Sequence, residues 1–115
     1  MNPGKPALHI KTAPAGGTVR VTLKGELIAE SRDALRMNEG NYPPVYYFPR
    51  KVVKMDRLVR SAHTTHCPFK GDASYFSVAG GPENAVWSYE QPYDEMLAIK
   101  DRLAFYPDKF EIKPS

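Results

Sequence analysis

The chain is poor in cysteine and has no long apolar run. Cys67 is the only cysteine among 115 residues, so no disulfide can form within the chain, which is typical of a protein from a reducing compartment. No apolar stretch approaches the roughly 18 residues that span a bilayer, and the first residues lack the apolar core of a secretory signal. We therefore expect a cytoplasmic protein that does not contact a membrane.

The surplus of charge of one sign is also small. The formal net charge is +3, and the two signs are interspersed except over residues 50–60, which hold five basic residues and one acidic residue. That stretch either binds an anion or is an ordinary solvated surface. With so small a surplus and no glycine–aromatic signature of an RNA-binding fold, nucleic acid is not an expected partner. Phosphate-binding glycine loops and the serine of a nucleophile elbow are missing as well.

Turn-forming residues, by contrast, are abundant. Eleven prolines and eight glycines are too many for a helical bundle and predict short elements separated by turns. Residues 18–24 alternate between apolar and polar, as half-buried strands do, and Lys24-Gly25 fits a tight hairpin turn into a second strand over residues 26–31. Further strands are expected over residues 8–11, 33–39, 45–48, 73–79, 85–90, 103–106 and 110–112, and one helix over residues 94–102, with Asp94 as its N-cap.

Prolines on both sides of residues 45–48 predict a short edge strand there. If the chain stays extended, Tyr46, Phe48 and Arg50 share one face. Residues 51–60 fit either one helical turn or an irregular crossing. The predicted fold is mainly β: a flexible tail (residues 1–7) precedes a single domain (residues 8–113), an antiparallel barrel or sandwich of about eight short strands with one short helix near the C-terminus.

The most compact candidate for chemistry is residues 64–71, Thr-Thr-His-Cys-Pro-Phe-Lys-Gly. Pro68 and the β-branched threonines favour an extended chain, in which His66 and Cys67 point to opposite faces. His66 is then a poor base for Cys67, and without a second ligand pair no metal site is expected. A tight turn after Pro68 would return Lys70 to Cys67, where its charge favours the thiolate. Cys67 is therefore either a nucleophile assisted by Lys70 or a buried structural residue.

Most aromatic residues of the chain flank this segment. Core packing accounts for many of them, but tyrosines combined with basic side chains are also the usual lining of a small-molecule site. The pocket is expected around the Cys67–Lys70 loop, with no cofactor, and Arg50 and Lys70 would hold a small anionic ligand. The candidate catalytic residues are Cys67 and Lys70, and the candidate ligand-binding residues are Tyr46, Phe48, Arg50, Thr65, Tyr75, Trp87 and Tyr89.

Four ordered blocks of the sequence resemble a known family. They are Tyr-Pro with Tyr-Phe-Pro-Arg (residues 42–50), Thr-His-Cys-Pro-Phe-Lys-Gly with Ala-Ser-Tyr (residues 65–75), Ala-Val-Trp-Ser-Tyr (residues 85–89), and Ala-Phe-Tyr-Pro (residues 104–107). Over about residues 8–112 the chain resembles the bacterial and fungal domain-of-unknown-function family numbered 427. The resemblance implies a compact, mainly β domain of bacterial cytoplasmic type and no established activity.

The chain differs from enzymes of metal-dependent nucleotidyl transfer, because it lacks their Gly-Ser and paired-aspartate pattern. It also has Lys51 and Val52 where members of the family often carry acidic residues, which makes the local field more positive. Two functions stay open. The first is a small-molecule-binding domain, whether or not it is an enzyme. The alternative is a non-catalytic protein-interaction module in which Cys67 is structural. The expected assembly is a monomer or a homodimer.

Overall fold

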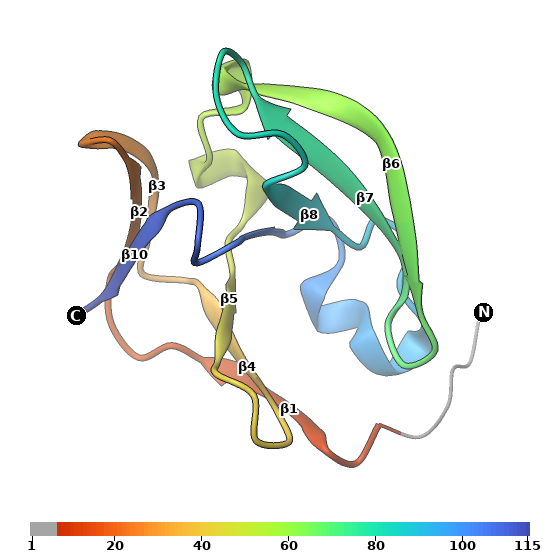
Figure 1. The fold of residues 1–115 in the computed structure, drawn as a ribbon. Helices are drawn as coiled ribbons and strands as arrows, with labels where there is room; N and C mark the ends of the chain where they lie inside the picture. Colours follow the sequence, from red (N-terminus) through yellow and green to blue (C-terminus); the bar gives the residue numbers. More distant parts are fainter. Residues whose placement is uncertain (1–6) are drawn as a thin grey trace.

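The computed structural model describes residues 7–115, which form a mainly β fold with ten strands and three short 3-10 helices (Figure 1). The predicted tail lies outside the described residues, except for residue 7. The strands are β1 (Ile10–Pro14), β2 (Val19–Leu23), β3 (Glu26–Ser31), β4 (Leu35–Glu39), β5 (Val45–Tyr47), β6 (Leu58–Cys67), β7 (Gly71–Val78), β8 (Val86–Ser88), β9 (Leu103–Phe105) and β10 (Glu111–Pro114). The 3-10 helices are η1 (Arg50–Val52), η2 (Met55–Arg57) and η3 (Asp94–Ile99).

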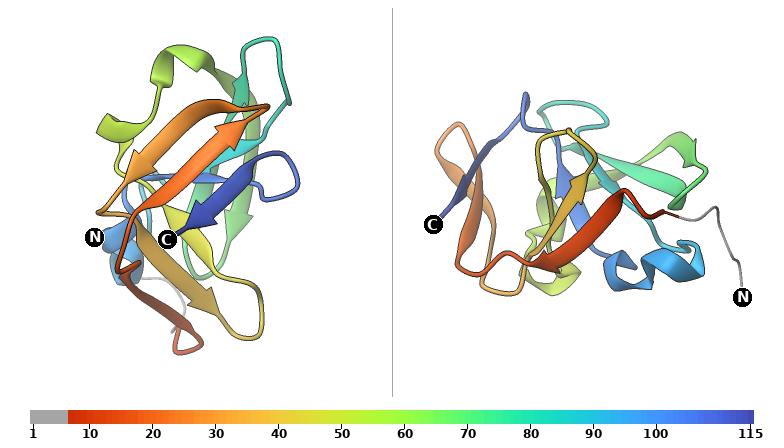
Figure 2. Two further views of the ribbon diagram at one scale, coloured as in Figure 1. Left: turned by 90° about the vertical axis from the view of Figure 1, so that its left-hand side faces the viewer. Right: turned by 90° about the horizontal axis from the view of Figure 1, so that it is seen from below.

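The strands are arranged in three antiparallel sheets. Their orders are β1-β4-β5, β10-β2-β3 and β6-β7-β8-β9, and Figure 2 shows β10 beside β2 and β3. The mainly β prediction is confirmed, but over residues 7–115 the sheets do not close into one barrel. A bridge connects the first sheet to the third. The Phe48 amide donates to the Leu103 carbonyl at 2.8 Å, and the Leu103 amide donates to the Phe48 carbonyl at 3.0 Å.

Two hairpin turns follow the local sequence. Between β2 and β3, Lys24 and Gly25 both have positive φ, 50° and 84°, as the predicted tight turn requires. Between β6 and β7, Cys67 pairs with Gly71, and the Lys70 amide donates to the Cys67 carbonyl at 3.3 Å. Gly71 has a φ of +111°, which L side chains rarely adopt. The predicted return of the chain after Pro68 is therefore confirmed.

The predicted helix over residues 94–102 is wrong in type and length. The chain makes 3-10 turns only as far as Ile99, Met96 has non-helical dihedral angles, and Tyr93 rather than Asp94 is the N-cap residue. Met96 and Ile99 are both buried, and three residues per turn place side chains at this spacing on one side.

Residues 51–60, left open by the sequence, contain most of η1, all of η2 and the start of β6. Within residues 7–115, no helix is long and apolar enough to cross a membrane.

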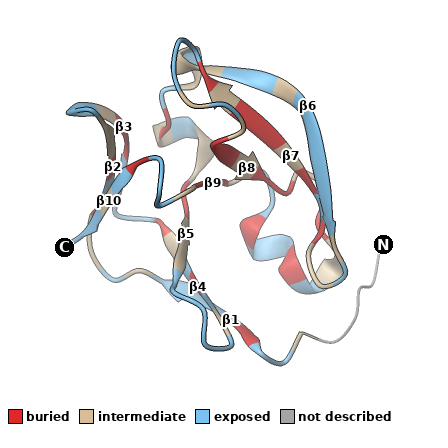
Figure 3. Cartoon of the chain, in the orientation of Figure 1, coloured by how far each residue is buried: buried red, intermediate tan, exposed pale blue. Residues whose placement is uncertain are grey.

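Two clusters of buried side chains form the core. The larger one joins the β10-β2-β3 sheet to the four-stranded sheet and includes Phe48, Phe76 and Phe105. The smaller one includes Tyr47 and Tyr75, with Trp87 and Tyr106 among the half-buried side chains packed against it. Figure 3 shows β7 and β8 largely buried, whereas β6 is exposed along most of its outer side. Several residues of the smaller cluster line a large surface depression that is rich in aromatic side chains.

Candidate functional site

A groove of about 520 Å³ opens between the β4–β5 hairpin on one side and the faces of β7 and β8 on the other. Its volume lies within the range of about 300–1,000 Å³ that is common for small-molecule sites. We call it the aromatic groove, because eight of its lining residues are aromatic: Tyr42, Tyr46, Tyr47, Tyr75, Trp87, Tyr89, Phe105 and Tyr106.

Strand pairing places the central rings of the groove next to one another. Tyr75 on β7 is the cross-strand partner of Trp87 on β8, and such partners project from the same face of a sheet. The Trp87 ring lies 4.5 Å from the Tyr106 ring, measured between centroids, at an interplanar angle of 47°. The Tyr47 ring meets Trp87 edge-on, at 6.4 Å and 89°. These rings form one continuous surface.

Tyrosine hydroxyls supply most of the polar groups in this surface. The Tyr75 hydroxyl lies 3.0 Å from Thr65 Oγ1 and 3.4 Å from the Tyr106 hydroxyl, and the Trp87 indole N–H donates to the Tyr47 hydroxyl at 3.3 Å. Burial raises the pKa of Tyr106 to about 12 and also raises the pKa of Tyr47 and of Tyr89. These phenols therefore stay neutral at physiological pH, and their hydroxyls can both donate and accept hydrogen bonds.

One ion pair forms part of the groove lining. Lys70 Nζ lies 2.8 Å from Glu39 Oε1, and the Lys70 side chain is only 12% exposed. The ammonium also lies 6.0 Å from the centroid of the Tyr89 ring. On its other oxygen, Glu39 is 3.8 Å from His9 Nε2. Lys70 therefore reaches the groove as predicted, but with its charge already balanced by a carboxylate.

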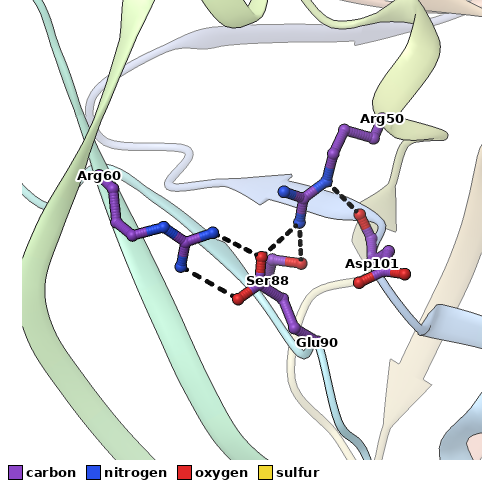
Figure 4. Close-up of polar contacts among 5 residues, drawn as sticks. All are labelled: Arg50, Arg60, Ser88, Glu90 and Asp101. Carbon is purple, nitrogen blue, oxygen red and sulfur yellow. Dashed lines mark hydrogen bonds and ion pairs between the residues drawn. The ribbon is translucent and has the colours of Figure 1, made fainter.

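Arg50 makes a second set of ionic contacts, shown in Figure 4. Its guanidinium donates to the Asp101 carbonyl and to Ser88 Oγ, both at 2.9 Å, and lies 3.2 Å from Glu90 Oε2. Arg60 binds the same carboxylate through two hydrogen bonds of 3.0 and 2.8 Å. The hydrogen bonds from Arg60, together with the charge of both arginines, lower the pKa of Glu90.

This cluster lies on the opposite face of the four-stranded sheet from the groove. Both guanidinium groups lie over the Phe76 ring, at 5.6 Å for Arg50 and 4.9 Å for Arg60. Because successive side chains of a strand point to opposite faces, Phe76 faces away from its neighbour Tyr75 in the groove. Arg50 is accordingly separated from the groove by the sheet, and it does not share a ligand site with Lys70.

The structure brings together five of the nine predicted site residues: Lys70, Tyr46, Tyr75, Trp87 and Tyr89 line the groove. Thr65 contacts Tyr75 from the neighbouring strand, outside the lining. Phe48 is fully buried in the larger core cluster. Tyr46 and Phe48 both pack against the larger core cluster, whereas Tyr47 between them belongs to the smaller one, as alternation in an extended chain requires. Arg50 lies beyond β5, in η1, and its guanidinium lies over the Phe76 ring of the larger cluster.

The strand alternation predicted around Cys67 is confirmed. His66 pairs across the hairpin with Asp72, with Nδ1 and Oδ1 2.7 Å apart, whereas Thr65 and Cys67 project from the other face. Cys67 is half-buried and packs against the smaller core cluster, and it does not line the groove.

Among the groove residues outside the predicted set, Glu39 and Tyr106 contribute polar groups. Glu39 ends a strand that alternation did predict, but nothing local indicates that it pairs with Lys70, 31 residues away. Tyr106 was placed on a predicted strand without a role, although its hydroxyl meets that of Tyr75. The sequence does contain one signal for Glu39: it is a polar residue at the end of an alternating strand, next to an aromatic turn.

Fold and site together define an antiparallel β domain with an aromatic groove whose polar groups are tyrosine hydroxyls and one ion pair. A family model matches residues 11–113, and its description is "Domain of unknown function (DUF427)". The chain belongs to this family, as its four sequence blocks indicated. No curated protein matches the chain.

Proposed function

We propose that this protein binds a small organic molecule in the aromatic groove. The observation that carries the proposal is the composition of the lining, in which apolar and aromatic walls surround a few convergent polar groups. Five of the site residues predicted from the sequence, which come from three separate segments of the chain, line this groove. The proposal is confined to binding, because Cys67, the candidate nucleophile, lies outside the groove lining.

Neutral phenols support binding more directly than catalysis. Tyr106 has a pKa of about 12 because it is buried, so it is a weak acid and is not a general base at physiological pH. Its hydroxyl, and those of Tyr75 and Tyr89, can nevertheless orient a ligand through hydrogen bonds. Aromatic walls and oriented hydroxyls together provide affinity and specificity without a covalent step.

The chain contains its own reporter for this function. Trp87 is the only tryptophan, and it lines the groove, so a bound molecule changes its fluorescence emission. A library of small polar and aromatic fragments is titrated against the protein while Trp87 emission and the thermal midpoint are recorded. We expect some fragments to shift the emission and to raise the midpoint by binding the native state.

A matched pair of variants locates the binding. Tyr42 is 74% exposed and lines the groove, whereas Leu97 is 56% exposed on η3 and does not. Tyr42→Ala should weaken the binding of responding fragments several-fold, and Leu97→Ala should leave it unchanged. A library that gives neither response, or equal weakening by the two variants, would refute a ligand site in the groove.

A further inference from the structure

The charges of the aromatic groove cancel. Lys70 and Glu39 are the only charged residues among its described lining residues, and they lie 2.8 Å apart. An anionic ligand would be attracted by Lys70 and repelled by Glu39. A cationic ligand would be attracted by Glu39 and repelled by Lys70. The complementary ligand for a lining of zero net charge is an uncharged one.

The polar groups of the groove nevertheless keep unused hydrogen-bonding capacity. The Lys70 ammonium has three donors, and within residues 7–115 its one hydrogen-bond acceptor is Glu39. No hydrogen bond joins the Tyr89 hydroxyl to the described part of the chain, and since no buried polar side-chain atom there lacks a partner, this hydroxyl is open to solvent at the groove. An accessible hydroxyl can donate and accept hydrogen bonds, so it can pair with a polar group of a ligand. Alcohol groups suit this end of the groove, because one hydroxyl can accept from Lys70 and donate to Glu39.

The aromatic rings are arranged for contact on one side of a ligand. Trp87 and Tyr106 are tilted against each other, Tyr47 meets Trp87 edge-on, and none of the ring pairs in residues 7–115 is parallel. The contacting rings of the groove thus present the tilted Trp87–Tyr106 surface to a ligand. A saturated ring has a face of C–H groups that can rest on a single aromatic surface, while its hydroxyls extend from the rim.

We propose that the ligand of the aromatic groove is an uncharged sugar or cyclic polyol. Its ring lies on the Trp87–Tyr106 surface, and its hydroxyls bridge Lys70 and Glu39 and pair with the Tyr89 hydroxyl. This inference rests on the proposed small-molecule function and specifies the class of ligand.

The first experiment compares chemical classes by titration of Trp87 fluorescence, with calorimetry as a second readout. The probes are glucose, cellotriose and myo-inositol as neutral compounds, glucuronate and glucosamine as charged analogues, and adenine and indole as flat rings. At least one of glucose, cellotriose and myo-inositol should bind, and glucuronate and glucosamine should each bind about tenfold more weakly than that compound, which corresponds to about 1.4 kcal/mol. If adenine or indole binds and none of glucose, cellotriose and myo-inositol does, the proposed ligand class is overturned, while the proposed small-molecule function stands. If no probe and no library fragment binds, both the ligand class and the proposed small-molecule function are overturned.

The second experiment inverts the charge preference. Glu39→Gln gives the lining a net positive charge and should improve glucuronate relative to glucose, whereas Lys70→Met gives it a negative charge and should improve glucosamine. Glu83→Gln, on the exposed turn before β8, removes one carboxylate away from the groove and serves as the control. Tyr89→Phe keeps the ring but removes the hydroxyl that pairs with the sugar, so it should weaken the sugar and spare a flat ring. Circular dichroism checks that both charge variants are folded. If the affinities of glucuronate and glucosamine relative to glucose are then unchanged in Glu39→Gln and Lys70→Met, the proposal is overturned.

Discussion

Replacement of Glu39 by glutamine should destabilise the protein far more than removal of an ordinary surface charge. The change leaves the Lys70 ammonium, only 12% exposed, without the carboxylate that lies 2.8 Å from it. Breaking a fully buried pair costs about 3–5 kcal/mol, and an exposed pair contributes about 0–1 kcal/mol. Since the Glu39 side chain is 27% exposed, we expect an intermediate loss of about 2 kcal/mol for Glu39→Gln.

The reverse change should cost less. Lys70→Met keeps the apolar stem in place and leaves a carboxylate that water can reach, so about 0–1 kcal/mol should be lost. In the double variant neither charge is left unpaired, and its stability should lie close to that of Lys70→Met. The coupling energy of the cycle then equals the loss in Glu39→Gln, about 2 kcal/mol.

Urea unfolding of the four proteins measures this cycle. Trp87 fluorescence reports the groove, and far-ultraviolet circular dichroism reports the sheets as an independent probe. With a slope of about 2 kcal/mol per molar urea, Glu39→Gln should lower the midpoint by about 1 M. If Glu39→Gln costs less than about 0.5 kcal/mol, or if the two single effects simply add, the pair behaves as an exposed one, and the reasoning about its burial is refuted.

Three further predictions concern the opposite face, the hairpin and the thiol. The pKa of Glu90 is lowered by Arg60, so this carboxylate stabilises the fold above the usual carboxyl pKa of about 4.3 and less as the pH falls through its lowered native value. Glu90→Gln should therefore lower the thermal midpoint at pH 7 more than at pH 3, and an equal loss at both values would contradict the ionic contribution. Gly71→Ala forces an L side chain to a φ of +111° and should cost about 1–2 kcal/mol in urea unfolding; a neutral result would mean that the turn relaxes. Cys67→Ala should leave the affinity of any groove ligand within about twofold by Trp87 titration, and a tenfold loss would place the thiol in the site.

Local sequence signals predicted the elements whose determinants are themselves local. The strand over residues 26–31 matches β3, and the turn at Lys24-Gly25 needed only two residues that tolerate positive φ. Alternation alone did not separate groove residues from core residues: Phe48 is fully buried in the larger core cluster and Arg50 lies in η1 over the Phe76 ring, so neither lines the groove with Tyr46. The helix expected over residues 94–102 is replaced by 3-10 turns that end at Ile99, and the spacing of the buried Met96 and Ile99 did not distinguish the two, because both helix types place residues i and i+3 on one side.

The pairing of charges could not be predicted at all, and it changes the interpretation of the site most. From the sequence, Arg50 and Lys70 are two cations near aromatic strands, which favours an anionic ligand. Folding gives each a carboxylate, from residues 40 positions away for Arg50 and 31 for Lys70, and sets the two pairs on opposite faces of one sheet. Charges that have been balanced within the fold attract no further ion, but their remaining donors and acceptors still bind hydroxyl groups. The choice between an anionic and an uncharged ligand therefore depends on one carboxylate, that of Glu39, and its removal should restore the preference for anions that the sequence alone suggests.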